Sequence, residues 1–273
     1  MSRLVPAAVI LALAASPGRA LEPPSPAEIV DKSQQVFYHA GADMKARVTM
    51  TLITADDKTR TRVLTMLRRN VQDSRNQKYF MYFSEPGDIR GTAFLVWKYP
   101  ERDDDRWIFI PAVNMVRRVA ARDSRSSFVG SDFTYEDISG RDASADTHTL
   151  LREEKLGDRE CYVIQSVPKG ATAHTKELAW IDKKTFLPLK EEYYDAQNEL
   201  ARLFTADAIT DVAAGKDATK EAYPTVTRRT VKNVKSGHRT EVRFDSVTYN
   251  AGLDDGLFTE RSLLTPPDRK SVV

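Results

Sequence analysis

The sequence contains very little cysteine and histidine, and this scarcity excludes several kinds of site. Its 273 residues include one cysteine, Cys161, and four histidines. A lone cysteine cannot form a disulfide within its own chain, so packing must hold the fold together. Cys161 stands beside Tyr162 and Val163 in a strand-like run, which predicts a buried structural thiol. The scattered histidines have no ligand spacing, so we predict neither metal nor cofactor.

Motifs of the common enzyme classes are missing as well. The chain has no G-x-S-x-G elbow, no phosphate-binding loop, no dinucleotide fingerprint and no H-E-x-x-H. Two acidic groups remain as alternatives, Asp103–Asp105 as cation ligands and Glu136 with Asp137 as an acid and a base. Their places in a charged turn and in a short helix favour structural roles. We therefore predict that the protein is not an enzyme.

Long hydrophobic runs are confined to the N-terminus. Arg3 precedes an apolar run, Leu4–Ala15, and small residues follow at Gly18–Ala20. This order is typical of a secretory signal peptide, and the run is shorter than the roughly 20 residues that span a bilayer. We predict that residues 1–20 are cleaved and that the mature chain is a periplasmic protein. No cysteine lies at the cleavage site, so we expect no lipid anchor there.

The charges of the predicted mature chain balance. The sequence has 41 basic and 39 acidic residues. Arg3 and Arg19 lie in the predicted signal peptide, which leaves 39 of each sign. Such a balance gives no electrostatic reason to expect nucleic acid as a partner. Without repeats or Pro-rich linkers, we expect a single, monomeric domain over residues 21–265 and a loose tail at 266–273.

The secondary-structure pattern is mainly β. Ser25 and Glu28 form a capping box that predicts a helix up to Gly41. Short helices are expected at Asp132–Ile138, capped by Ser131, and at Asp254–Leu263. From Lys45 onward, roughly eleven alternating segments at short spacing predict one large antiparallel sheet or an unclosed barrel.

The segment Arg106–Pro111 has the most informative pattern. A strand with one wet face alternates apolar and polar residues, but this segment is apolar at every position from Trp107 to Ile110. The pattern predicts a strand that is covered on both faces, or one that also faces an apolar ligand.

Bulky apolar side chains in the predicted strands are candidates for an apolar cavity. Alternation places only near neighbours on one face, and the same side chains would suit an ordinary core equally well. The eight candidates are Met50, Leu52, Leu64, Met66, Phe94, Trp107, Phe109 and Trp180.

A basic cluster follows the apolar segment. It consists of Arg117, Arg118, Arg122 and Arg125. We interpret it either as a solvated strand face or as a contact for an acidic partner or anionic lipid headgroups.

Several motifs in this order resemble a known family. The chain has R-G-T at Arg90–Thr92 and R-W-I-F-I-P-A at Arg106–Ala112. G-S-D-F-T-Y-E-D-I follows at Gly130–Ile138, and a W-I-D-x-x-T-x-x-P-L meander at Trp180–Leu189. Over Glu28–Leu263 the chain resembles the outer membrane lipoprotein-sorting proteins, which are similar to LolA in fold.

The resemblance implies an unclosed β-barrel around a helical plug, with an apolar cavity between them. It also implies a periplasmic carrier of lipids or lipidated proteins whose partners include RND-type (MMPL-like) exporters and outer-membrane acceptors. The chain is longer than classical LolA, so a free lipid is as good a cargo as a lipoprotein. Two alternatives stay open: an RseB-like envelope sensor that binds lipid and regulates a membrane protein, and an enzyme acting on lipids.

Overall fold

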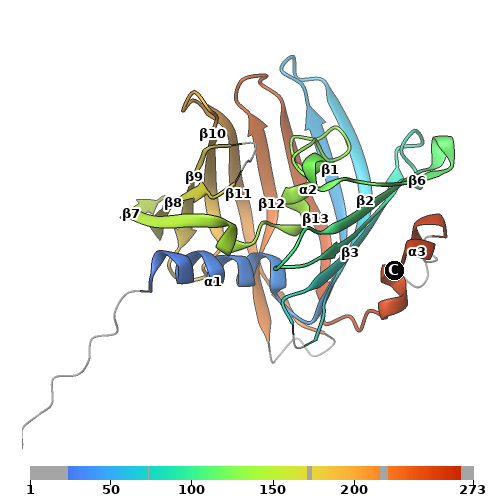
Figure 1. The fold of residues 1–273 in the computed structure, drawn as a ribbon, viewed down its shortest axis with the longest axis horizontal. Helices are drawn as coiled ribbons and strands as arrows, with labels where there is room; N and C mark the ends of the chain where they lie inside the picture. Colours follow the sequence, from blue (N-terminus) through green and yellow to red (C-terminus); the bar gives the residue numbers. More distant parts are fainter. Residues whose placement is uncertain (1–23, 73, 171–173, 216–220, 266–273) are drawn as a thin grey trace, which may run out of the picture.

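The computed structural model describes residues 24–72, 74–170, 174–215 and 221–265. The predicted signal peptide and the predicted tail lie outside these ranges. Within them, 13 antiparallel strands form one sheet with the order β6-β5-β4-β3-β2-β1-β13-β12-β11-β10-β9-β8-β7. Strands β6 and β7 are its two edges, so the curled sheet does not close (Figure 1). The expected mainly-β, unclosed fold is confirmed.

The strands and helices have the following bounds. The first six strands are β1 (Asp43–Ile53), β2 (Thr59–Asn70), β3 (Gln77–Glu85), β4 (Ala93–Lys98), β5 (Asp105–Ile110) and β6 (Met115–Arg118). The others are β7 (Asp146–Leu156), β8 (Arg159–Pro168), β9 (Lys176–Asp182), β10 (Pro188–Tyr194), β11 (Leu200–Ala213), β12 (Ala222–Asn233) and β13 (Arg239–Tyr249). The α-helices are α1 (Pro26–His39), α2 (Tyr135–Ser139) and α3 (Glu260–Leu264), and a short 3-10 helix, η4 (Asp255–Phe258), precedes α3.

The helix starts follow capping chemistry. In α1 the Ser25 hydroxyl accepts a hydrogen bond from the Glu28 amide at 3.3 Å, and the Glu28 carboxylate accepts one from the Ser25 amide at 2.7 Å. This confirms the predicted capping box. The second helix begins later than expected, because Thr134 caps it instead of Ser131. The Ser131 hydroxyl instead donates to the Phe128 carbonyl at 2.7 Å and closes the preceding loop.

A plug segment, which we define as residues 119–140 including α2, fills the concave side of β1–β5 and β12–β13. Its apolar side chains join inward-facing strand residues in the largest buried cluster of the described protein. Phe128 of the plug lies 5.3 Å from the ring of Phe94 and 6.1 Å from that of Phe83. Burying aromatic surface in this way makes the plug part of the core, because each ring removes about 150–250 Å² from water.

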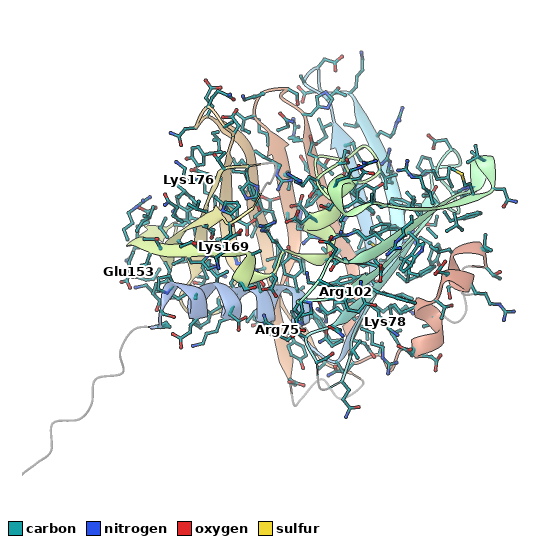
Figure 2. All side chains as sticks on the ribbon, viewed as in Figure 1. Arg75, Lys78, Arg102, Glu153, Lys169 and Lys176 are labelled. Atoms are coloured by element: carbon teal, nitrogen blue, oxygen red, sulfur yellow. The ribbon has the colours of Figure 1, made fainter. Side chains whose placement is uncertain are left out.

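The convex side of β3–β5 is covered by the C-terminal segment that contains η4 and α3. Trp107, Leu253, Phe258 and Leu263 share a buried cluster there, while Ile108 belongs to the concave core. The indole of Trp97 donates to the Phe258 carbonyl at 2.9 Å. Lys78, labelled in Figure 2, forms an ion pair with Asp255 of η4 at 2.8 Å. Strand β5 is therefore covered on both faces, which is the first of the two alternatives that its sequence left open.

The other half of the sheet packs differently. Ile29 of α1 lies against Ile164, Ala179 and Ile181 on the concave side of β8 and β9. Cys161 is fully buried on the opposite side, which confirms the predicted structural thiol. Helix α1 crosses in front of this half (Figure 1). A cavity lined by α1, the plug and the strands of this half is the candidate site.

Candidate functional site

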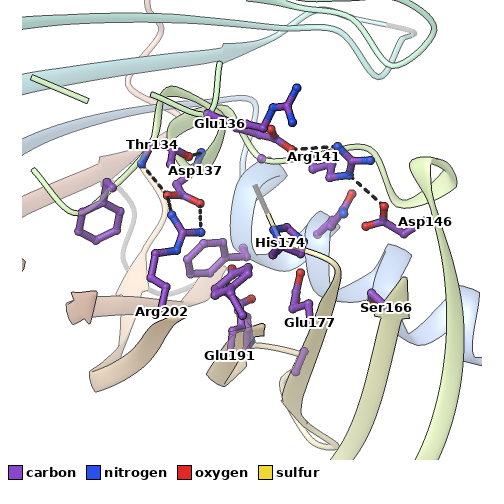
Figure 3. A pocket seen from close by; sticks show the side chains of 18 of the residues that line it. Thr134, Glu136, Asp137, Arg141, Asp146, Ser166, His174, Glu177, Glu191 and Arg202 are labelled. Carbon is purple, nitrogen blue, oxygen red and sulfur yellow. Dashed lines mark hydrogen bonds and ion pairs between the residues drawn. The ribbon is translucent and has the colours of Figure 1, made fainter. Parts of the chain in front are cut away.

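A cavity of about 390 Å³ lies on the concave side of β7–β11. Helix α1, the plug and the strands all contribute to its walls, and Figure 3 shows part of the lining. Ligand pockets in proteins commonly enclose about 300–1,000 Å³, so this space is large enough for a small organic molecule or a lipid headgroup with part of its chain.

One row of side chains crosses the floor of the cavity. Each member faces the next across a pair of neighbouring strands, so the row runs perpendicular to the strands from β7 to β12. In that order the row is His148, Ser166, Glu177, Tyr193, Arg202 and Asn233, and all six line the cavity. A continuous polar row on the inner face of a sheet is costly unless hydrogen bonds or a ligand satisfy it.

Most charged groups of the cavity are paired within the protein. Arg202 donates two hydrogen bonds to the Asp137 carboxylate, at 2.7 and 2.9 Å, and so fixes α2 to β11 (Figure 3). Arg141 bridges Glu136 at 3.2 Å and Asp146 at 3.0 Å. These contacts give Glu136 and Asp137 structural partners and hold the plug over the strands.

Two glutamates of the cavity have no such ion pair with an arginine among the described residues. Glu191 accepts one hydrogen bond, from the Tyr193 hydroxyl at 2.5 Å. Glu177 forms no hydrogen bond or ion pair with any residue that the structure describes, and its carboxyl projects into the cavity near His174 (Figure 3). Burial, and next the Glu191 charge, raise the pKa of Glu177 well above its ordinary value. Burial likewise raises the pKa of Glu191.

His174 supplies no positive charge to these glutamates at neutral pH. Burial first, and then the nearby Arg202, lower the pKa of His174 to about 4. Its ring lies 5.1 Å from that of Tyr193, edge to face. The imidazole is therefore neutral above pH 6, and the surplus of acidic groups in this part of the cavity remains.

A second, much smaller cavity of about 50 Å³ adjoins the first. Phe37 and Tyr38 of α1 line both cavities, and Met44 and Met66 line the small one. The small cavity also contains Arg229, whose guanidinium lies 5.3–5.5 Å from three phenylalanine rings. Thioether and aromatic side chains can shift to admit apolar groups of different shapes.

The structure does not bring the eight predicted cavity residues to one place. Met50, Leu52, Leu64, Met66 and Phe94 face the concave side in the cluster that includes the plug, and Met66 also lines the small cavity. Trp107 and Phe109 lie on the convex side beneath the C-terminal segment. Trp180 belongs to another convex cluster, because its neighbour Ala179 is the residue that faces the cavity. Ligand contact by any of the eight stays a prediction.

The predicted basic cluster is also divided. Arg117 and Arg118 are exposed on edge strand β6, where Arg118 forms an ion pair with Asp105. Arg122 is exposed and lies 3.8 Å from Asp123. Arg125 instead lines the cavity from the plug. Exposed apolar residues adjoin Arg117, since Val113 and Met115 are 62% and 45% accessible.

Sequence reasoning missed the polar row for a physical reason. A candidate list built from bulky apolar residues selects Trp180 and passes over Glu177 and Ala179, which face the cavity on the same strand. The register between β9 and β10 also shifts between Pro188 and Lys190. Counting every second residue of β10 from Pro188 therefore does not lead to Glu191. Paired Glu177 and Tyr193 share the concave face, but only the register reveals this.

Comparisons with known proteins agree with the fold. A family model described as "Uncharacterized protein"-like matches residues 75–265. No curated protein matches the chain in sequence.

Solved structures that are similar over most of the chain include the following three. A DUF1329 family protein from Desulfovibrio piger is 26% identical, with a TM-score of 0.79, covering 88% of this chain and 100% of its own. A putative outer membrane lipoprotein-sorting protein domain from Vibrio parahaemolyticus is also 26% identical, with a TM-score of 0.78 and coverage of 87% and 97%. A LolA superfamily protein from Nitrosomonas europaea, 20% identical with a TM-score of 0.64 and coverage of 88% and 99%, shares the fold.

The family match spans well over half of the chain, and the structural likeness spans nearly all of its described part. The chain therefore belongs to this uncharacterised family, and it has the LolA-like fold of the outer membrane lipoprotein-sorting proteins that its sequence resembles.

Proposed function

We propose that the protein is a periplasmic carrier that binds a lipid, or the acyl chains of a lipidated protein, and hands it between envelope partners. An inner-membrane exporter and an outer-membrane acceptor are the partners that this role requires. The cavity between α1, the plug and the open sheet is the observation that carries the proposal. The likeness to a putative outer membrane lipoprotein-sorting protein domain supports it.

The physical need for such a carrier is large. Each acyl methylene that leaves a membrane for water costs about 0.8 kcal/mol, so a chain of roughly 16 carbons costs on the order of 10 kcal/mol. A protein cavity offsets this cost only if apolar surface encloses the chain. The methionine-lined small cavity adjoins the large one through Phe37 and Tyr38. We infer that an acyl chain enters there while the headgroup stays among the polar side chains.

Among the described residues, no helix combines the length and apolar character needed to cross a membrane. Native mass spectrometry of protein purified from the periplasm, with lipid extraction, tests the proposal. Stoichiometric bound lipid is the expected result. Repeated recovery of the protein without lipid, and no uptake of a fluorescent fatty acid, would contradict it. Co-purification with a single-span regulator instead of an exporter would favour the sensor role.

Filling the cavity should prevent binding without unfolding the protein. Gln34 of α1 lines the cavity, and its neighbour Gln35 does not. The change Gln34→Trp should therefore reduce uptake of a fluorescent fatty acid at least tenfold, because the indole occupies the ligand's space. The control Gln35→Trp introduces the same side chain on the same helix and should bind normally. Equal binding by both variants would show that the ligand lies elsewhere.

The exposed tip of the sheet near β6 should contribute to docking. Arg117 and Arg118 stand beside the exposed Val113 and Met115, so charge and apolar surface occur together at this edge. Changing Arg117 and Arg118 to Glu should slow lipid transfer to anionic vesicles, more strongly at low salt, because screening weakens such contacts. The control Arg60→Glu reverses another exposed arginine. If the variant transfers lipid at the wild-type rate at low ionic strength, Arg117 and Arg118 form only a solvated strand face.

A further inference from the structure

The two cavity glutamates occupy neighbouring positions on one face. Glu177 pairs with Tyr193 across β9 and β10, and Ala179 pairs with Glu191. The glutamates are thus diagonal neighbours on the concave face, with Cβ atoms about 7 Å apart. Two carboxyl groups with that spacing can both reach a small polar group between them.

The surrounding charges leave an acidic surplus at this point. Six of the cavity's lining residues are acidic and three are arginines. Arg202 is engaged by Asp137, and Arg141 by Glu136 and Asp146. Among the described residues, Arg125 forms an ion pair with neither glutamate, and no lysine lines the cavity. A buried carboxyl group without a partner is costly, so the site favours a ligand that supplies hydrogen-bond donors or positive charge.

Aromatic side chains complete the surroundings. Tyr193 donates to Glu191, and Phe37 and Tyr38 face the cavity from α1. Arg202 already lies 4.3 Å from the Tyr193 ring and Arg229 lies 5.5 Å from the Phe37 ring, so the preference for positive charge comes from the two carboxyl groups. We propose that Glu177 and Glu191 form the headgroup subsite of the cavity and that this subsite takes an amphipathic ligand carrying a primary ammonium group. This inference rests on the proposed lipid-binding function and names the chemical class of the ligand.

Proton release should accompany binding. An ammonium group placed between the glutamates stabilises their ionised forms, whereas burial raises their pKa values in the empty site. The charged groups that act on Glu177 are Glu191, Asp146, Asp137 and Arg202, and those that act on Glu191 are Asp137, Arg202 and Arg229. These effects are present before the ligand enters. Binding of an ammonium ligand near pH 7 should therefore displace protons into the buffer.

Isothermal titration calorimetry with three matched amphiphiles tests the inference. Decylammonium, decanol and decanoate share one chain and differ in headgroup. Decylammonium should bind the wild-type protein at least tenfold more tightly than the others, because each hydrogen bond to a charged group adds substantially to affinity. Titrations in two buffers with different ionisation enthalpies should show proton release for decylammonium alone.

Substitutions locate the preference. Glu177→Gln and, separately, Glu191→Gln should abolish the preference for decylammonium and reduce proton release, while Glu101→Gln, at an exposed loop position, should leave both unchanged.

Since burial raises the pKa of Glu177, the wild type loses stability as the pH rises above the unfolded value of about 4.5. The thermal midpoint of Glu177→Gln should therefore equal that of the wild type at pH 4 and exceed it at pH 8. The same measurement shows whether the variant is folded.

The outcomes separate the two proposals. Equal binding of the three amphiphiles, or tighter binding of decanoate, would overturn the ammonium subsite and leave the carrier function standing. A preference that survives in both Gln variants would also overturn it. If none of the amphiphiles binds and no lipid is recovered with the protein, the carrier function itself fails.

Discussion

Replacing Phe94 with alanine should lower the free energy of unfolding by about 3–5 kcal/mol. The side chain is fully buried and lies 5.3 Å from the ring of Phe128 and 5.2 Å from that of Tyr135. Truncation would leave a cavity where the plug meets β4 and would remove two aromatic contacts at once. A loss of this size is a large share of the roughly 5–15 kcal/mol by which proteins are stable.

Urea denaturation at equilibrium measures the effect. Leu151→Ala, at a side chain that is 43% exposed on β7, is the control and should change stability by at most about 0.5 kcal/mol. A Phe94→Ala variant that keeps its stability but loses lipid binding would show that Phe94 lines a ligand pocket. The experiment therefore decides between core and pocket, the choice that the apolar pattern leaves open.

Replacing Arg202 with methionine should cost about 3 kcal/mol of stability. The change removes both hydrogen bonds to Asp137 and leaves that carboxylate, and the nearby Glu191, without their cationic neighbour. Breaking one side of an enclosed ion pair is costly because the remaining charge has lost its water and its partner. The variant should also release α2 from β11 and so loosen the wall of the cavity.

A double-mutant cycle with Asp137→Asn measures the coupling. The amide oxygen of asparagine can still accept the hydrogen bond from the Thr134 amide that caps α2, so the change isolates the ion pair. We expect a coupling energy of about 1–3 kcal/mol. Arg152→Met removes an exposed ion pair with Glu154 on β7 and should cost less than about 1 kcal/mol. Additive effects of the two changes would contradict a structural ion pair.

The sequence by itself determined the class of the fold and much of its local structure. The alternation of apolar and polar residues predicted the strands, and Ser25 with Glu28 predicted the start of α1. The fully apolar segment around Trp107 predicted a strand covered on both faces, and Cys161 a buried thiol. Each of these properties depends on residues that are close together in the chain.

Only the tertiary structure decided which face of each strand lines the cavity. Alternation gives two faces but does not say which one is concave, and the irregularity between Pro188 and Lys190 alters the alternation on β10. The polar row joins six strands, so no local window contains it. Glu177 and Tyr193 become neighbours only through strand pairing, and Asp137 reaches Arg202 only when the plug folds into the sheet.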